Sequence, residues 1–391
     1  MEKSVLVINC GSSSVKLALY NTADTRQATI TALAERLGEG EAHLQIRGAL
    51  DTDIHAPMSH RDALNSFFST CSEQLQGLAA VGHRVVHGGE EFHDSILLDD
   101  DTVTRLESLS VLAPLHNPMN LMGIRLVQEL RPGVANVAVF DTSFHQSMPA
   151  SSYLYGVPYD WYEDYQVRRY GFHGTSYRFV TAETARRLQR EPDDLNLLIA
   201  HLGNGCSACA VRQGRSVDSS MGLTPLEGLV MGTRCGDTDP GLIEHMLRES
   251  DLSMDDIMRS LNRDSGLKGL SGISNDMRTL LAAEEEGNEA ARRAIDVFCF
   301  RVARQLAALS ANLSSTDAVV FTGGIGEHSA IVRRRILAAW RSIPFRLNTD
   351  LNEGNGADDG RISETGTPLV LVIPTDEERM IAQDTCKITG L

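Results

Sequence analysis

Long apolar segments are missing from this sequence. No stretch approaches the roughly 20 apolar residues that a membrane-spanning helix needs. The first apolar run, Val5–Ile8, is too short for the core of a secretory signal peptide. The seven cysteines are scattered and odd in number, which is typical of free thiols in a reducing compartment and not of a disulfide framework. We therefore expect a cytoplasmic protein with no membrane partner.

Positive charge is also scarce. The 36 Lys and Arg residues are outnumbered by 52 Asp and Glu residues, which gives a formal net charge of −16. This balance argues against nucleic acid or an anionic membrane as the main partner, because both reward clustered cations. A few local arginines can still make one cleft positive, so an anionic substrate remains compatible. The 391 residues exceed what one hydrophobic core usually supports, which favours two domains.

Two segments of the chain share one design, in which an apolar strand is followed by a turn of small residues and a second strand. The first segment covers residues 5–20 and turns at Asn9–Ser14, and the second covers residues 197–211 and turns at His201–Gly205. The two segments align without a gap. This weak symmetry indicates either two related lobes or a chance match of two hairpins.

Helical periodicities alternate with apolar, strand-like runs along the rest of the chain, which predicts an α/β protein. Further strands are expected at Val134–Phe140, Ala318–Phe321 and Leu369–Ile373, and helices at Met119–Leu130, Arg178–Leu188, Leu242–Arg248, Glu289–Leu313 and Ile331–Ile343. The segment Leu351–Arg361 is rich in Asn, Gly and Asp, so we expect a surface loop there.

Three turns of small residues follow predicted strands. They are Asn9–Ser14, His201–Gly205 and Thr322–His328. Glycine lets a backbone approach a phosphate closely, and concave groups of backbone N–H bonds bind anions. One such turn is usually structural, but three in one chain indicate phosphate binding. None of them matches the pattern G-x-x-x-x-G-K-[ST], so the design would differ from a P-loop.

Charged residues lie in or next to other segments of the chain that are predicted to be loops or strand ends. Arg84 and Arg234 each lie among glycines, in what we interpret as loops, and a guanidinium group suits carboxylate or phosphate oxygens. Asp141 follows a predicted strand, where ligands bind in α/β sheets. The histidines lack the spacing of a zinc site. The pair Cys206 and Cys209 would point to opposite faces of a strand, so a redox or metal role is not expected.

In order along the chain, these segments resemble the acetokinase (acetate kinase) family, within the acetate and sugar kinase/actin-like superfamily. The matching strings are NCGSSSVK, GHRVVHGG, APLHNP, FDTSFHQSMP, YGFHGTS, HLGNG, GLVMGTRCGDTDPG, SGISNDMR, FTGGIGE and TDEE. The resemblance implies an α/β fold with two ribonuclease-H-like (actin-like ATPase) lobes flanking a nucleotide cleft. It places the N-terminal lobe at residues 1–145, with a helix at 378–391 packing back on it. The C-terminal lobe, at 146–377, would carry the adenosine pocket.

The resemblance also implies an activity, which is reversible phosphoryl transfer from ATP to acetate to give acetyl phosphate and ADP. Direct in-line transfer is the preferred route, and a phosphoenzyme on Glu377 is the other. The alternative substrate is propionate or another short-chain carboxylate, and a rival of another class is a non-catalytic protein of the same fold. Mg²⁺ is the implied cofactor, with Mn²⁺ as an alternative ion, ATP and ADP are the co-substrates, and a homodimer is the implied assembly.

The resemblance assigns a role to individual residues where the motifs match. Catalysis is assigned to Asp141, Arg234 and His173, and the metal site to Asn9 and Glu377. Substrate binding is assigned to Arg84, with an apolar methyl pocket from Val86, Leu115, Phe172 and Pro225. Nucleotide binding is assigned to Ser12, Ser14, Lys16, His201, Leu202, Gly203, Asn204, Gly205, Asp276, Met277, Arg278, Gly324, Ile325, Gly326, Glu327 and His328.

Four positions depart from the family's usual residues. They are Met119 in place of Pro, Tyr177 in place of His, Cys235 in place of Ser and His328 in place of Asn. His328 bears on the choice of nucleotide. Cys235 stands beside Arg234, and a neighbouring cation tends to lower a thiol's pKa and make it reactive. The alternative is that Cys235 only replaces a serine of similar size, with its sulfur turned into the protein.

Overall fold

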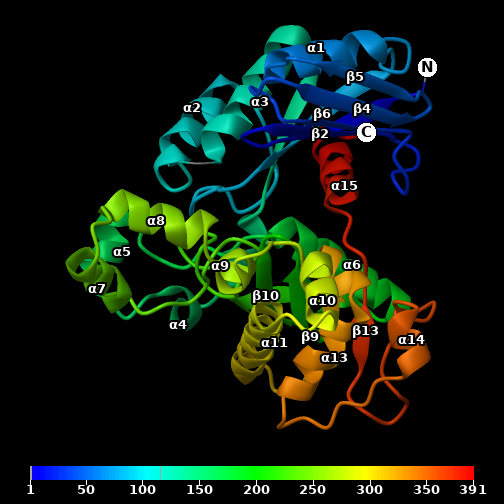
Figure 1. Cartoon of the computed structure of the whole chain (residues 1–391). Coiled ribbons are helices and arrows are strands. Elements are labelled where there is room, and N and C mark those ends of the chain that lie inside the picture. The colour runs from blue at the N-terminus through cyan, green and yellow to red at the C-terminus, as the bar shows by residue number, and fades with distance from the viewer. Residues whose placement is uncertain (1, 115) are drawn as a thin grey trace. The chain divides into compact units, whose positions relative to one another are not determined.

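The computed structural model describes residues 2–114 and 116–391, so Leu115 lies outside the described residues. The chain divides into two compact units. Unit 1 comprises the residues up to Phe144 together with Asp376–Leu391, and unit 2 is His145–Thr375. Figure 1 labels their elements. No helix within the described residues is long and apolar enough to cross a membrane.

Unit 1 is built on a sheet of eight strands, in the order β5-β4-β3-β2-β1-β6-β8-β7. The strands are β1 (Ser4–Cys10), β2 (Ser14–Asn21), β3 (Ile30–Glu35), β4 (Ala42–Gly48), β5 (Thr52–Ala56), β6 (Leu78–Val85), β7 (Ile96–Leu97) and β8 (Ala135–Phe140). Strands β1 to β5 form an antiparallel meander, whereas β1, β6 and β8 run parallel to one another.

Both faces of this sheet are covered, which explains why β1 is buried along nearly its whole length and apolar from Val5 to Ile8. The helices of unit 1 are α1 (His60–Thr70), α2 (Asp100–Ser108), α3 (Asn117–Leu130) and α15 (Glu377–Thr389). Leu6 of β1 belongs to the core cluster that includes residues of α1 and α3, and its neighbour Val7 belongs to the cluster that includes Ile381 of α15. Successive side chains of β1 therefore serve two separate cores.

Gly82 allows α15 to approach β6 closely. A Cβ atom at this position would lie 2.2 Å from Thr385 Oγ1 and 2.7 Å from Ile381 Cγ2, both on α15. Gly82 and Arg84 are two residues apart on β6, so they point to the same face of the sheet. The missing side chain at Gly82 thus fixes how near the first turn of α15 comes to Arg84.

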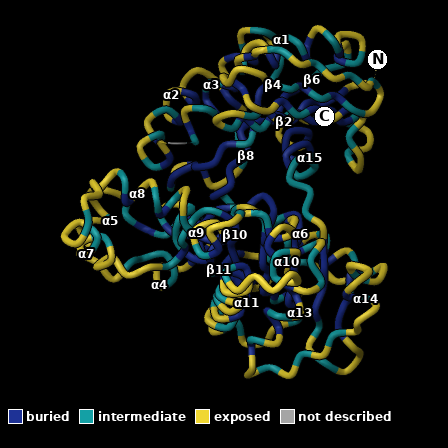
Figure 2. Tube along the Cα trace, viewed as in Figure 1, coloured by how far each residue is buried: buried dark blue, intermediate teal, exposed yellow. Residues whose placement is uncertain are grey.

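Unit 2 contains a sheet of five strands, in the order β11-β10-β9-β12-β13. The strands are β9 (Asn196–Leu202), β10 (Cys206–Arg212), β11 (Arg215–Ser219), β12 (Ala318–Thr322) and β13 (Val370–Val372). The helices are α4 (Ala150–Tyr153), α5 (Asp160–Tyr165), α6 (Gly174–Leu188), α7 (Gly241–Glu249), α8 (Met254–Arg263), α9 (Gly266–Ser271), α10 (Met277–Glu285), α11 (Glu289–Leu309), α12 (Gly323–His328), α13 (Ala330–Ala339) and α14 (Thr349–Glu353). The central strands are buried, as the dark tube in Figure 2 shows for β10.

The two sheets share one local topology. In unit 1 the antiparallel hairpin β1–β2 is followed by the parallel strands β6 and β8, and in unit 2 the hairpin β9–β10 is followed by the parallel strands β12 and β13. The duplication that the two hairpins suggested therefore extends to both sheets. In each unit the carboxyl ends of three parallel strands meet at one edge, which is where ligands bind in α/β proteins.

Three local expectations are wrong. Arg84 lies in β6, not in a loop. The turn at Thr322–His328 forms the short helix α12, because Gly323 adopts a positive φ of 75° and its N–H donates to the Glu327 carboxylate. The expected loop Leu351–Arg361 begins inside α14, because the Asn348 side chain caps that helix by accepting from the N–H of Leu351.

Candidate active-site halves

The carboxyl ends of β1, β6 and β8 bring three polar side chains together in unit 1. Arg84 Nη2 donates to Asp141 Oδ2 over 2.5 Å, and Arg84 Nε lies 3.1 Å from both Asp141 oxygens. Arg84 Nη1 also donates to Asn9 Oδ1 over 3.4 Å. Burial disfavours the charged guanidinium, but the carboxylates of Asp141 and Glu377 outweigh it, so the pKa of Arg84 stays above its usual range.

Glu377 joins this cluster from the first turn of α15. The helix begins there because the Asp376 side chain accepts from the N–H of Arg379. Glu377 Oε2 lies 3.9 Å from Arg84 Nε. Burial raises the pKa of Glu377 to about 7, the charge of Asp141 adds to the rise, and Arg84 opposes it. The carboxyl groups of Asp141 and Glu377 thus outnumber the single guanidinium group of Arg84 that lies between them and could neutralise their charge.

The turn between β1 and β2 lies beside these groups in the sheet. It is closed by a bond from the N–H of Gly11 to the Ser14 carbonyl (2.8 Å), and it contains Ser12, which is exposed. Lys16 follows on β2 and forms a 2.6 Å ion pair with Glu378 of α15. The lysine side chain is 56% exposed, so it is reachable from solvent while its partner fixes its position.

In unit 2 the turn Gly203–Gly205 after β9 is the centre of the second group. A methyl group on Gly205 would lie 3.5 Å from His173 Nε2 and 3.7 Å from Arg234 Nη1. Both side chains therefore face this turn. His173 caps α6 in the left-handed conformation (φ 58°), and its ring stacks on that of His201 at 4.3 Å. Burial lowers the pKa of Arg234.

A cavity of about 520 Å³ opens beside the same turn. It brings together both segments that the resemblance assigned to the adenosine pocket. Its lining comprises Gly203, Asn204, Asn275, Asp276, Met277, Arg278, Leu281, Gly324, Ile325, His328 and Ser329. Gly326 and Glu327 are not part of this lining. The carboxylate of Glu327 accepts instead from the N–H groups of Gly323 and Thr375, so it ties the ends of β12 and β13 together.

The residues expected to surround a methyl group are divided between the units. Val86 is buried at the end of β6, where its N–H donates to Asn120 Oδ1 over 3.1 Å. Phe172 is buried next to His173 in unit 2, and the carbonyl of Pro225 accepts from Arg234 Nη1 over 3.2 Å. Leu115 lies outside the described residues.

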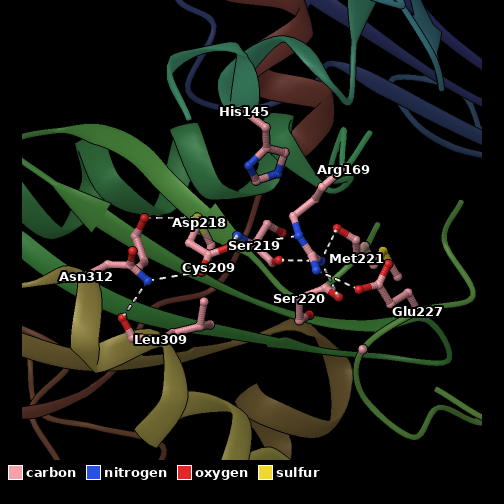
Figure 3. Close-up of polar contacts among 12 residues, drawn as sticks. His145, Arg169, Cys209, Asp218, Ser219, Ser220, Met221, Glu227, Leu309 and Asn312 are labelled. Atoms are coloured by element: carbon pink, nitrogen blue, oxygen red, sulfur yellow. Dashed lines mark hydrogen bonds and ion pairs between the residues drawn. The ribbon is translucent and has the colours of Figure 1, made fainter. Parts of the chain in front are cut away.

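Arg169 bonds to the segment from Ser219 to Glu227, as Figure 3 shows. Its Nη1 donates to the carbonyls of Ser219, Ser220 and Met221, and its Nη2 pairs with Glu227 Oε1 at 2.6 Å. The other Glu227 oxygen accepts from the hydroxyl of Tyr155. Arg169 is four residues from His173, so one side chain links the backbone around His173 to the segment of Arg234.

The sequence reasoning missed Arg169, Glu227 and Tyr155. The partners are 58 and 72 residues apart, so no local pattern joins them. A signal was nevertheless present at Gly222, where a Cβ would lie 1.7 Å from Glu227 Oε2. Such a glycine marks a close approach, but the sequence does not name what approaches.

The expectation that Arg234 lowers the pKa of Cys235 is wrong. Burial raises the pKa of this thiol, and its Sγ donates to the carbonyl of Gly236 at 3.1 Å. The side chain is only partly buried. Cys235 therefore fits the alternative, in which a neutral thiol takes the place of a serine with its sulfur engaged by the backbone.

Known proteins match this chain over nearly its whole length. Residues 4–383 match the model of the acetokinase family. The acetate kinase of Ectopseudomonas mendocina is 49% identical over 98% of both chains, and that of Agathobacter rectalis is 46% identical over 99% of this chain and all of its own. Among solved structures, a propionate kinase from Francisella tularensis superposes with a TM-score of 0.94 at 39% identity, covering 99% of this chain and all of its own. The acetate kinase of Porphyromonas gingivalis gives 0.92 at 37% identity and covers 99% of both chains.

The raised pKa of Glu377 predicts how the stability of the ligand-free protein depends on pH. A carboxyl that binds its proton more tightly when folded stabilises the protein fully below the ordinary glutamate pKa of 4.5, and this stabilisation is lost as the pH rises through about 7. A Glu377→Gln variant cannot ionise there. We expect the variant to gain stability relative to the parent between these pH values.

Urea unfolding at several pH values measures this difference. Glu353→Gln, an exposed glutamate of α14, is the control and should give a constant difference. A constant difference for Glu377→Gln as well would contradict the raised pKa.

Proposed function

The chain belongs to the acetokinase family, and we propose that it transfers the γ-phosphoryl group of ATP to the carboxylate of acetate and back. The observation that carries this proposal is the convergence of His173 and Arg234 on Gly205, next to a cavity lined by Asp276–Arg278 and Gly324. The cavity suits a nucleoside, and the turn suits its phosphates. A cation and an imidazole beside a phosphate turn are what phosphoryl transfer needs.

The acceptor needs no general base. A carboxylic acid with a pKa near 4–5 is ionised at neutral pH, so a carboxylate oxygen attacks the γ-phosphorus directly. The bond from the γ-phosphorus to the bridging oxygen breaks, and that oxygen leaves on ADP with the electron pair. The barrier comes largely from repulsion between two anions, so charge neutralisation and positioning are the enzyme's main contributions.

The residues of the two units divide this work. Arg84 binds the carboxylate of acetate, and the carboxylate of Asp141, which already accepts three hydrogen bonds from Arg84, keeps the guanidinium oriented. Arg234 and His173 contact the equatorial oxygens of the transferring group. The low exposure of Asp141, 1%, means that this orienting pair works largely screened from water.

The donor set of unit 1 fits Mg²⁺. Asn9, Asp141 and Glu377 offer amide and carboxylate oxygens, which are the ligands that this hard ion prefers. Burial raises the pKa of Glu377 and the charge of Asp141 adds to the rise, so a cation bound here would favour the ionised carboxylate. When bound with the nucleotide, Mg²⁺ neutralises phosphate charge, and Mn²⁺ has the same preference for oxygen. Asn9 and Glu377 would hold the ion.

Direct in-line transfer is the route that we propose. A phosphoenzyme would need Glu377 as the nucleophile, but this side chain is only 20% exposed and lies next to Asp141 and Arg84. Its raised pKa also leaves part of it protonated at neutral pH. Acetate, which diffuses in fully ionised, is the better nucleophile.

A propionate kinase is the second candidate, because the solved propionate kinase superposes on this chain with a TM-score of 0.94. We favour acetate because the curated relatives at 49% and 46% identity are acetate kinases. The difference between the substrates is one methylene group, which is worth only about 1–3 kcal/mol in an apolar pocket. Both acids should therefore be accepted to different degrees.

A homodimer is also proposed, formed through the apolar side chains of α5, α7 and α8. Helix α7 has no buried residue, and Figure 2 shows it in yellow. The exposed apolar side chains, called the α5–α8 surface below, are Tyr159, Trp161, Tyr165, Leu242, Leu247, Met254 and Met258. An apolar surface of this kind marks an interaction site, and a second copy of the chain is its proposed occupant.

The proposed location is the cytoplasm. The seven cysteines are all free thiols, which supports a reducing compartment. Both substrates are cytoplasmic metabolites in this proposal. Detection of the protein in a periplasmic or secreted fraction, with the cytoplasm empty of it, would contradict the location.

The first prediction concerns the two arginines. Arg84→Ala and Arg234→Ala should each lower turnover by roughly 10²–10³-fold, because each removes a charge that counters the developing anion. A coupled assay of ADP release with ATP, Mg²⁺ and acetate measures this loss, and circular dichroism checks folding. Arg61→Ala and Arg259→Ala remove exposed arginines of the same two units and should leave turnover unchanged. Near-normal activity of a folded Arg84→Ala or Arg234→Ala variant removes that arginine from the mechanism.

The second prediction concerns substrate size. Acetate should have the highest kcat/KM, propionate should follow by roughly 5- to 100-fold, and butyrate should be poorer still, because each added methylene crowds an apolar pocket. Val86→Ala should narrow the gap between acetate and propionate. If butyrate is the best substrate of the parent, the acetate assignment is wrong and only the kinase class survives.

The third prediction concerns assembly. Light scattering should give twice the mass of one chain for the parent. Trp161→Glu combined with Leu247→Glu places charges on the α5–α8 surface and should yield monomers. Val111→Glu changes an apolar side chain of unit 1 that is 81% exposed and should leave the dimer intact. A dimer that persists in the double variant would place the interface elsewhere.

A further inference from the structure

Tyr177 connects to His173 through Ser207 inside unit 2. The hydroxyl of Tyr177 contacts Ser207 Oγ, which in turn lies 2.8 Å from His173 Nδ1. Tyr177 and Ser207 are fully buried. The N–H of Tyr177 donates to the carbonyl of His173 over 3.0 Å, so the two side chains are one helical turn apart at the start of α6. Ser207 is the second residue of β10, immediately beyond the turn that contains Gly205.

The hydrogen bonds that link Tyr177, Ser207 and His173 have one direction from donor to acceptor. The phenolic hydrogen of Tyr177 needs an acceptor inside the protein, because this side chain is fully buried. Ser207 Oγ is the acceptor that remains for it among the described residues. Burial raises the pKa of Tyr177 well above its usual value, so the phenol keeps its hydrogen. Tyr177 therefore donates and Ser207 accepts.

The hydroxyl hydrogen of Ser207 then needs an acceptor of its own. Its hydroxyl is buried, and among the described residues its side-chain contacts are Tyr177 and His173 Nδ1. A buried hydroxyl that leaves its hydrogen unpaired destabilises the folded protein. Ser207 therefore donates to Nδ1. A neutral imidazole carries one N–H, so the hydrogen of His173 resides on Nε2.

This tautomer directs a donor at the phosphate turn. His173 Nε2 is the ring nitrogen that lies 3.5 Å from a methyl group built on Gly205, where Arg234 Nη1 lies at 3.7 Å. The opposite tautomer would present a lone pair to phosphate oxygens beside Arg234. Such an arrangement repels the anion that the site must bind.

The surroundings of His173 also oppose a second proton on its ring. Arg234 and the stacked ring of His201, whose Nδ1 bonds to Ser176 Oγ at 2.8 Å, are among the titratable and charged groups around it. A doubly protonated ring would donate from Nδ1 to Ser207. Ser207 would then have to donate to Tyr177, and the Tyr177 hydroxyl would no longer have Ser207 as its acceptor. The ring of His145 meets that of Tyr177 edge-on, with 5.6 Å between the ring centres, and its Nε2 lies 2.9 Å from the carbonyl of Phe172.

We propose that Tyr177 and Ser207 are positioning residues that hold His173 as the neutral tautomer with its hydrogen on Nε2, as a donor to the transferring phosphoryl group. The role in transfer rests on the proposed function, whereas the tautomer itself does not. Tyr177 acts through two other side chains, so it is not a catalytic residue. The competing explanation is that Tyr177 only fills the core under β9 and β10.

The test uses Tyr177→Phe, which removes the hydroxyl and keeps the ring. Selective ¹⁵N labelling of histidine, with the His173 signal identified through His173→Asn, reports which ring nitrogen carries hydrogen. The parent should show an unprotonated Nδ1 and a protonated Nε2. In the variant both signals should move toward each other as the tautomers mix. Turnover should fall roughly 3- to 30-fold with the KM values for ATP and acetate within about twofold, because only orientation of one donor is lost.

The pH profile adds a readout that packing alone would not change. Without the phenol, Ser207 can accept from a protonated Nδ1, so the acid limb of turnover should move to higher pH in Tyr177→Phe. Tyr170→Phe is the matched control, since it removes another buried tyrosine hydroxyl of unit 2, which donates to the Gln166 carbonyl. The control should alter neither the His173 signals nor the pH profile.

Two outcomes would overturn the proposal. One is a parent protein with hydrogen on Nδ1 of His173, which can be recorded even if Tyr177→Phe does not fold. The other is a folded Tyr177→Phe variant with unchanged His173 signals and turnover. If the parent phosphorylates no short-chain carboxylate, the proposed function fails, but the nitrogen signals still decide the tautomer.

Discussion

Parallel pairing of β6 with both β1 and β8 is the constraint on which the rest of unit 1 depends. It delivers Asn9, Arg84 and Asp141 to one edge of the sheet, where Arg84 reaches both partners. The arrangement requires a helix to cover the same face closely, and Gly82 supplies the space. The position of Glu377 therefore follows from a backbone register and one missing side chain, and no flexible loop is involved.

The two units present opposite electrostatics at their strand ends. In unit 1 the carboxyl groups outnumber the guanidinium, and the pKa of Glu377 rises. In unit 2 burial lowers the pKa of Arg234, whose hydrogen-bond acceptors among the described residues are the carbonyl of Pro225 and the sulfur of Met231, both uncharged. The strand ends of unit 1 are therefore electrostatically suited to a cation, and those of unit 2 to an anion.

Patterns among neighbouring residues predicted the features of the fold that depend on neighbouring residues. Alternation predicted the strands and the two small-residue turns that follow β1 and β9, whereas the third expected turn forms α12. The resemblance supplied the family. The pattern could not show that Arg84 lies within a strand, because the flanking glycines suit a loop as well as a close helix contact. Nor could it reveal the bonds of Arg169 to Glu227 or of His173 to Ser207, whose partners are 58 and 34 residues apart. Of the two alternatives for Cys235, the lowered pKa is wrong because burial raises the pKa of this thiol.

The division of unit 1 along the chain has a consequence for biosynthesis. Residues up to Phe144 leave the ribosome first, but α15, which covers Val7 and Val137, belongs to Asp376–Leu391 and is translated after all of unit 2. One apolar face of the sheet of unit 1 therefore stays uncovered by α15 while about two hundred and thirty further codons are translated. The nascent chain must keep that face from misassociating, and the same last segment brings Glu377. Completion of the first core and arrival of that carboxyl group are therefore one event.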